Sequence, residues 1–206
     1  ATNTSSLSIT ELAKSVDCPE RIVGMHFFNP VRKMPLVEII KGESSSNLAI
    51  NNVAQLAIRL GKTPIVVKDV PGFLINRLLG PYLDEALRLF SAGITAERIE
   101  KTAENFGMPM GPLRLLDEVG LDIATNAAES LHKGYGVRMI PNSRINLEFG
   151  SERLGRKTKK GFYSFNHHKA TLCDDLKGFQ PSLSKIRLTD QEITDRLILS
   201  MVNEAA

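Results

Sequence analysis

The sequence predicts an α/β fold followed by an all-α fold, and three observations support this order. Two apolar runs at residues 22–28 and 36–40 have strand character. A segment with helical spacing and then a β-branched run follow them. After Asp-Val-Pro-Gly at residues 69–72 the pattern changes to long helices. We therefore expect an α/β part at residues 1–70, a helical part at 71–165, a linker at 166–188 and a new amphipathic helix at 189–206.

The first part reads as the back half of an α/β domain. Ser8 and Glu11 have the spacing of a capping box, which opens a short helix. Gly61 is a typical residue to end the second helix of this part. The predicted elements, in order, are a helix to about residue 16, strands at 22–28 and 36–40, a helix at 47–60 and a strand at 63–68.

The second part is predicted to consist of helices. Apolar residues from Ile75 to Phe90 form one stripe at helical spacing, in which Pro81 is expected to kink the helix and Gly93 to end it. Further helices are expected from a Thr95 cap through residue 105, from Gly111-Pro112 to about residue 131, and for a turn or two at 142–149.

Composition excludes several classes of protein. The chain has 206 residues, 42% of them hydrophobic, and a formal net charge of +3, which does not indicate a nucleic-acid-binding or membrane protein. No apolar run approaches the ~20 residues that span a bilayer. Cys18 and Cys173 are far apart and form neither a disulfide framework nor a metal-ligand pattern. The cysteine usage therefore predicts a protein of a reducing, intracellular compartment.

One histidine and one glutamate lie inside the two predicted strands. His26 is in the first run and Glu38 is in the second. Burial of an imidazole and a carboxylate is unfavourable unless they satisfy each other, and a histidine held by a glutamate is a proton acceptor that works near neutral pH. On spacing alone, a structural histidine beside a solvated edge glutamate remains the alternative.

Five motifs follow one another in a fixed order: NTSSL at 3–7, HFFNPV at 26–31, LVEII at 36–40, PGFLINRLL at 71–79 and MGPLRLLDEVGLD at 110–122. Together they resemble the 3-hydroxyacyl-CoA dehydrogenase family, in particular the dehydrogenase part of the multifunctional fatty-acid oxidation proteins. The resemblance covers residues 1–165 plainly and the remainder more loosely. It implies the back half of a Rossmann-like NAD-binding domain, a helical dehydrogenase domain, and at 189–206 the start of a second helical repeat.

The resemblance also implies an activity and a set of residues. The activity is NAD-dependent oxidation of the β-hydroxyl of a 3-hydroxyacyl-CoA thioester in fatty-acid β-oxidation, with no metal. His26 would be the base and Glu38 would orient its ring. Ser5 and Asn76 would complete the catalytic set, and Ser5, Asn29 and Asn76 would contact the substrate. Residues near the nicotinamide and its ribose would be Asn3, Ser5, Asn29 and Lys157.

The chain as given holds no glycine fingerprint for dinucleotides. The one G-x-G, at Gly134 and Gly136, lacks the third glycine and a preceding strand. The sequence begins without methionine, so we expect a piece of a longer polypeptide whose first half carries the phosphate site. The isolated chain is then expected to bind NAD poorly, to be inactive, and to self-associate through an unpaired strand edge.

Two charged segments and two other functions complete the sequence-based picture. Asp117, Glu118 and Asp122 are expected to form a solvated face rather than a metal site. The basic run at 153–160 is out of step with a P-loop and is read as a solvated loop, although the resemblance brings Lys157 toward the cofactor. The resemblance implies that the complete protein forms a homodimer or a complex with a thiolase subunit, in the cytoplasm of a bacterium or in the mitochondrial or peroxisomal matrix of a eukaryote. The alternatives are a helical dimerisation or interaction module, which a light-scattering mass would test, and a related hydroxy-acid reductase.

Overall fold

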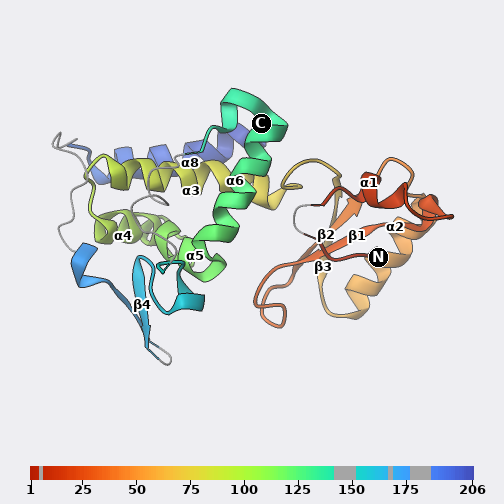
Figure 1. Cartoon of the computed structure of the whole chain (residues 1–206), viewed down its shortest axis with the longest axis horizontal. Helices are drawn as coiled ribbons and strands as arrows, with labels where there is room; N and C mark the ends of the chain where they lie inside the picture. The colour runs from red at the N-terminus through yellow and green to blue at the C-terminus, as the bar shows by residue number, and fades with distance from the viewer. Residues whose placement is uncertain (5–6, 142–151, 167–168, 177–186) are drawn as a thin grey trace. The chain divides into compact units, whose positions relative to one another are not determined.

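The computed structural model describes residues 1–4, 7–141, 152–166, 169–176 and 187–206 (Figure 1). The chain divides into two compact units, Ala1–Arg77 and Leu78–Ala206. The predicted helical turns at 142–149 lie outside the described residues. The first unit is a small mixed sheet with helices and the second is mostly helical, which confirms the predicted change of fold class along the chain.

The sheet of the first unit has three strands in the order β1 (Gly24–Phe27), β2 (Leu36–Lys41) and β3 (Thr63–Lys68). β1 and β2 are antiparallel, and β3 runs parallel to β2. Helix α2 (Asn47–Arg59) makes the crossover that a parallel pair requires. β1 is shorter than the predicted run at 22–28, and Thr2 extends its free edge by a parallel bridge to Gly24.

The first unit packs its apolar residues around two small clusters. Ile50 and Ala57 of α2 lie with Val23, Val37 and Ile39 of the sheet, as the helical spacing predicted. A 3₁₀ turn (η1, Pro19–Arg21) precedes the sheet. The second cluster consists of Ile9, Ile40 and Phe73.

Helix α1 (Ile9–Ala13) is shorter than the predicted helix to residue 16, and its cap differs from a simple capping box. Ser8 Oγ accepts from the Glu11 N–H at 3.2 Å, as predicted, but it donates to Asp69 Oδ2 at 2.7 Å. The Thr10 N–H also donates to Asp69 Oδ2, at 2.7 Å. Burial would raise the pKa of Asp69, but these hydrogen bonds outweigh it and lower the pKa. Asp69 therefore ties the end of β3 to the start of α1.

The second unit contains five described helices. They are α3 (Ile75–Ser91, which begins in the first unit), α4 (Ala96–Phe106), α5 (Pro112–Val119), α6 (Leu121–Tyr135) and α8 (Asp190–Ala205). Pro81 lies inside α3, and Thr95 caps α4 as predicted. The single helix predicted from residue 112 to 131 is wrong, because Gly120 at φ 98° separates α5 from α6.

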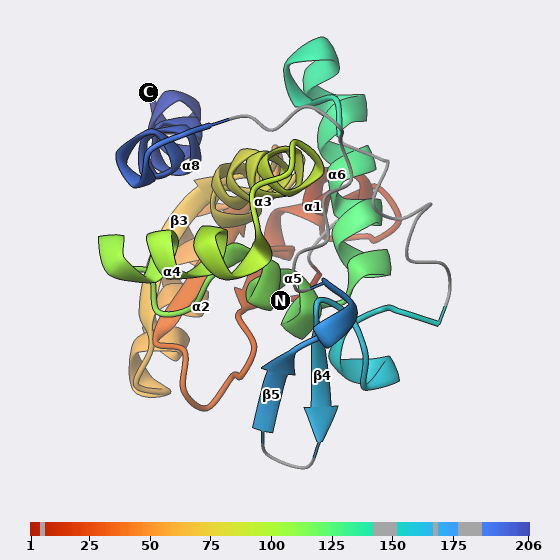
Figure 2. The same ribbon diagram turned by 90° about the vertical axis from the view of Figure 1, so that its left-hand side faces the viewer.

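A hairpin contradicts part of the predicted linker. Strands β4 (Tyr163–Asn166) and β5 (Lys169–Leu172) pair antiparallel (Figure 2). Short 3₁₀ turns lie at η2 (Gly136–Met139), η3 (Arg156–Thr158) and η4 (Asp174–Leu176). Cys173 and Leu176 are buried in the core of the unit. The linker prediction is therefore wrong for residues 169–176, because apolar contacts hold them.

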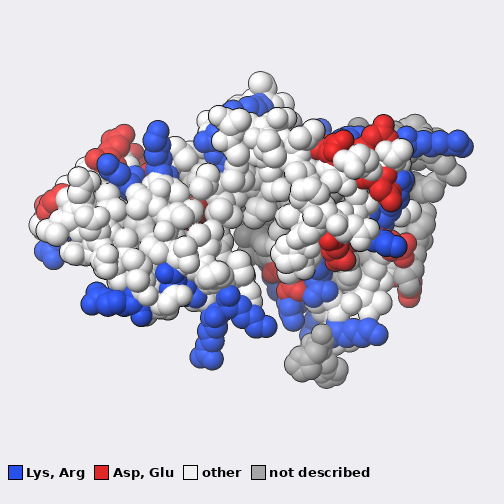
Figure 3. Space-filling view, turned by 180° about the vertical axis from the view of Figure 1, so that it is seen from behind, with Lys and Arg blue, Asp and Glu red and all other residues white. Residues whose placement is uncertain are grey.

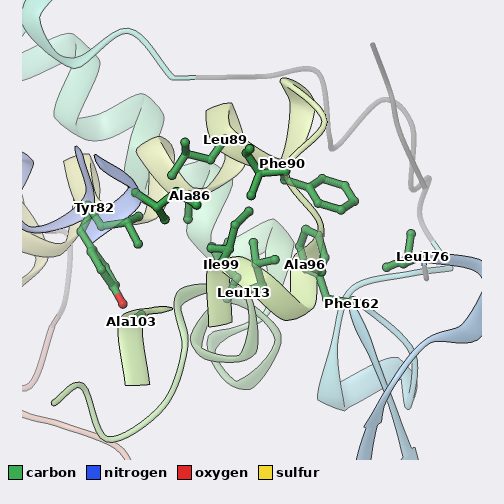
Figure 4. Packing of buried hydrophobic residues seen from close by; sticks show 14 of the residues in the cluster. Tyr82, Ala86, Leu89, Phe90, Ala96, Ile99, Ala103, Leu113, Phe162 and Leu176 are labelled. Carbon is green, nitrogen blue, oxygen red and sulfur yellow. The ribbon is translucent and has the colours of Figure 1, made fainter. Parts of the chain in front are cut away.

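One apolar core joins the elements of the second unit. Tyr82 and Phe90 of α3, Ile99 of α4 and Leu113 of α5 lie in it, and the Phe162 ring meets that of Phe90 edge-on at 5.4 Å (Figure 4). Ile193 and Leu197 of α8 are fully buried in the same cluster. That this helix begins a second repeat stays a prediction.

Two carboxylates of the second unit are buried, and both oxygens of each accept hydrogen bonds. Asp117, predicted to be solvated, is 0% exposed and accepts from the Phe162 and Tyr163 N–H groups at 3.0 and 2.7 Å. Glu100 accepts from the N–H groups of Leu113 and Arg114 and from Tyr163 Oη, at 2.8, 3.2 and 2.7 Å. Burial raises the pKa of Glu100 to about 7 and that of Asp117 to about 6, against the opposing effect of these hydrogen bonds.

The basic run is paired rather than freely solvated. Arg153 binds both carboxylate oxygens of Asp175 at 2.9 Å, and Arg156 binds Glu118 at 2.6 Å. On the face seen in Figure 3, Lys and Arg side chains lie in several separate groups rather than in one patch. Within the described part of the chain, no helix is both long enough and apolar enough to cross a bilayer.

We predict that Gly155→Ala destabilises the protein much more than Gly93→Ala. Both glycines have a positive φ, 92° and 94°, so both variants carry a backbone strain of ~1 kcal/mol or more. A Cβ at Gly155 would lie 2.4 Å from the Asp117 carbonyl oxygen, whereas nothing lies within 4 Å at Gly93. Chemical denaturation should show a further loss of ~2 kcal/mol at Gly155. Equal losses would contradict the close packing.

We also predict that Glu100 makes the protein less stable as pH rises. The pKa of Glu100 is about 7 in the folded state, whereas in the unfolded chain the carboxyl has its ordinary pKa of 4.5. The folded state therefore binds more protons across this window, and stability falls as pH rises from about 4.5 to about 7. Glu100→Gln should reduce that fall by up to roughly 3 kcal/mol, measured by denaturant unfolding at several pH values. The exposed Glu97→Gln is the control, and identical pH dependence in both variants would refute the assignment.

Candidate active site

The sheet of the first unit brings His26 and Glu38 together as direct cross-strand partners on β1 and β2. His26 Nδ1 lies 2.8 Å from Glu38 Oε2. The two residues are 7% and 0% exposed. Two antiparallel neighbours on one face of a sheet are close enough for such a bond, so the strand register brings the two side chains together.

The second carboxylate oxygen of Glu38 binds the start of helix α3. The N–H groups of Leu74 and Ile75 donate to Glu38 Oε1 at 2.9 and 3.0 Å. These are N–H groups that a helix leaves without partners, and the positive end of the helix dipole favours a carboxylate there. Glu38 thus accepts three hydrogen bonds in a site without solvent exposure.

These contacts determine which nitrogen of His26 can act. An ionised carboxylate only accepts hydrogen bonds, so the Glu38 contact requires the proton of the neutral ring on Nδ1. Nε2 then holds the free lone pair, and it has no hydrogen-bond partner among the described residues. An imidazole held in this way can act as an oriented proton acceptor.

Aromatic rings flank the imidazole. The Phe28 ring centroid lies 4.7 Å from that of His26, and the Phe73 ring meets it edge-on at 5.7 Å. The contacts of both rings and of the Leu74 and Ile75 N–H groups with the pair were not predicted from the sequence. The Pro71-Gly72 turn before α3 could have indicated them, since a turn there brings the start of the helix back to the sheet.

Asn76 follows the two N–H donors directly in the chain. It is partly buried and forms no hydrogen bond with the described residues. The first turn of α3 is attached to Glu38, so the backbone of Asn76 is held close to the carboxylate. The structure therefore brings Asn76 to the neighbourhood of the pair, and its role as a substrate contact stays a prediction.

The asparagines predicted near the cofactor are exposed. Asn3 Oδ1 accepts from the Phe27 N–H at 3.4 Å, which sets Asn3 beside the residue after His26. Asn29 begins the loop between β1 and β2. Lys62 Nζ donates to the carbonyl oxygens of Val31 and Met34 of this loop, the latter at 2.8 Å.

The placement of two other predicted site residues, Ser5 and Lys157, relative to the pair stays a prediction. Ser5 lies outside the described residues. Lys157 belongs to the second compact unit, where its Nζ contacts Asp122 Oδ2. Gly120, between α5 and α6, also lies close to this pair.

The described helices of the first unit offer no open N-terminus for the phosphates of a dinucleotide. Side chains already occupy all three: Ser8 and Asp69 at α1, Ser46 at α2 and Glu38 at α3. Helix N-termini are the usual sites for pyrophosphate in α/β domains. None of these three helix starts is therefore free to bind the pyrophosphate of a dinucleotide.

Comparison with known proteins places both parts of the chain in one family. Residues 1–70 match the NAD binding domain of 3-hydroxyacyl-CoA dehydrogenase, and residues 72–165 match its C-terminal domain. The fatty acid oxidation complex subunit alpha of Idiomarina loihiensis is 44% identical over 211 residues, which cover 100% of this chain and 29% of the relative. That of Acinetobacter baylyi is 43% identical and covers 99% of this chain and 30% of the relative.

Solved structures of dehydrogenases support the same family assignment. The (S)-3-hydroxybutyryl-CoA dehydrogenase of Ralstonia eutropha matches with a TM-score of 0.75 and 39% identity, over 80% of this chain and 59% of that chain. The dehydrogenase part of multifunctional enzyme 1 from C. elegans matches with a TM-score of 0.68 and 33% identity, over 98% of this chain and 47% of that one. The chain spans about a third or less of the curated relatives, and it belongs to the 3-hydroxyacyl-CoA dehydrogenase family.

Proposed function

We propose that this chain carries the proton-transfer site of an NAD-dependent 3-hydroxyacyl-CoA dehydrogenase that acts in fatty-acid β-oxidation. The observation that supports it most is the buried His26–Glu38 pair, in which Nδ1 is held at 2.8 Å and Nε2 has no partner among the described residues. Oxidation of a β-hydroxyl to a ketone needs one base within hydrogen-bond reach of the hydroxyl. A related hydroxy-acid reductase is not expected to carry this pair.

The proposed chemistry follows from the pair. The hydroxyl proton moves to His26 Nε2 while the C–O bond becomes a carbonyl. NAD, when bound, supplies the acceptor for the hydride that leaves the same carbon. The imidazolium that forms stays close to the Glu38 carboxylate, which lowers the energy of the charged ring. The N–H groups of Leu74 and Ile75 keep that carboxylate fixed during the transfer.

The other roles complete the proposal. Ser5 and Asn76 would hold the hydroxyl or keto oxygen and the thioester carbonyl, so that the reacting carbon is positioned. Asn29 would contact both substrate and cofactor, and Asn3 would contact the nicotinamide side. Lys157, which contacts Asp122 in this structure, would approach the cofactor.

The relatives suggest the setting of this site. They are alpha subunits of fatty acid oxidation complexes, about three times the length of this chain. We propose that the phosphates of NAD bind to a glycine-rich turn in the same complete polypeptide and that a thiolase subunit, or a second copy, is its partner. A bacterial protein of this kind would act in the cytoplasm.

We predict that His26→Gln lowers kcat by roughly 100-fold or more, because a positioned general base contributes that much. The assay is NADH production from a 3-hydroxyacyl-CoA by the Acinetobacter baylyi subunit with this chain in place of its matching segment. Glu38→Gln should also lower kcat, since it leaves the ring less oriented. The isolated chain is the negative control, and wild-type turnover in both variants would refute the proton-transfer assignment.

We predict that Asn76→Ala lowers kcat in the same chimera by about tenfold or more while the chain keeps its thermal unfolding midpoint. The amide has no hydrogen bond to the described residues, so its removal should leave the fold intact. Asn52→Ala, on the exposed face of α2, is the matched control. Loss of cooperative unfolding in Asn76→Ala would instead show that the amide is structural.

A further inference from the structure

Phe73 has a backbone conformation that a bulky residue rarely adopts. Its φ is 51°, in the left-handed region, and its side chain is only 3% exposed. A non-glycine residue in this region is strained, and the strain persists only where the surroundings fix it. Such residues often mark a place where geometry serves a function.

The left-handed conformation turns the chain toward Glu38. The Phe73 N–H donates to the Val70 carbonyl at 2.9 Å across Pro71 and Gly72, and Gly72 has φ 74°. This is the pattern of a type II turn, with proline second and glycine third. The next two N–H groups, of Leu74 and Ile75, are those that donate to Glu38 Oε1. Phe73 comes directly before these two donors, so its backbone conformation sets the direction of their N–H groups.

The side chain of the same residue contacts the other member of the pair. Its ring meets the His26 ring edge-on, with centroids 5.7 Å apart and planes at 63°. Ile9 and Ile40, both fully buried, hold the ring from the core side. Phe73 therefore restricts the imidazole through its ring and the carboxylate through its backbone.

We infer that Phe73 is a positioning residue that keeps the His26 ring and the Glu38 carboxylate oriented toward each other. It touches no reacting atom. With the ring removed, the imidazole can rotate away from Glu38, and the Nδ1 proton becomes accessible to water more often. The structural part of this inference stands alone, and its kinetic part rests on the proposed function.

The first test uses the 206-residue chain itself. NMR measures the exchange of the His26 Nδ1 proton with water in Phe73→Leu and in Ile9→Val, which trims the same cluster without touching His26. Phe73→Leu should speed exchange by about tenfold, and Ile9→Val by less than about twofold. Phe73→Met, whose unbranched and flexible side chain adapts to an irregular space, carries the test if Phe73→Leu fails to fold. Equal exchange in the Phe73 variants and Ile9→Val would overturn the inference.

The second test measures kcat and KM in the chimera. Phe73→Leu should lower kcat by about tenfold and leave KM within about twofold, because a misoriented base slows chemistry without weakening binding. Ile9→Val should change neither. A rise in KM alone would overturn the positioning role. If His26→Gln leaves kcat unchanged, the proposed function fails, and the proton exchange still decides the role of Phe73.

Discussion

The first unit depends on the burial of one carboxylate. Glu38 has no contact with solvent, so its charge must be balanced inside the protein. One oxygen binds His26 on the neighbouring strand and the other binds the first N–H groups of α3. A single residue thereby links two strands to a helix that begins 37 residues later in the chain, and it leaves one histidine nitrogen oriented and free. Stability and the proposed chemistry have the same origin.

The second unit also contains buried carboxylates that accept hydrogen bonds from backbone N–H groups, but without a histidine. Glu100 binds the first N–H groups of α5, and Asp117 binds the backbone at the start of the hairpin. Glycines leave the space that these carboxylates fill, because a Cβ at Gly111 or Gly161 would lie within 2.3 Å of them. The N-terminus of α5 and the backbone at the start of β4 are thus satisfied by buried side chains.

Residues whose partners are close in sequence could be predicted. The strands around His26 and Glu38, the crossover helix α2 and the Thr95 cap depend on local periodicity and capping, and each was expected near its observed place. Asp117 was misjudged because its partners lie 45 and 46 residues away, so nothing local shows its burial. The break at Gly120 and the hairpin at 163–172 were missed for the same reason: tertiary contacts decide them. The site pair was predictable from its motifs, whereas Phe73 needed the geometry.

The central claim is that Glu38 fixes His26 with its proton on Nδ1 and its lone pair on Nε2. The most direct measurement is a long-range proton–nitrogen NMR spectrum of the ¹⁵N-labelled chain, recorded where His26 is neutral. The account predicts a protonated Nδ1 and an unprotonated Nε2, which Glu38→Gln should shift toward a mixture of the two forms. A neutral ring that carries its proton on Nε2 in the unaltered chain would contradict it.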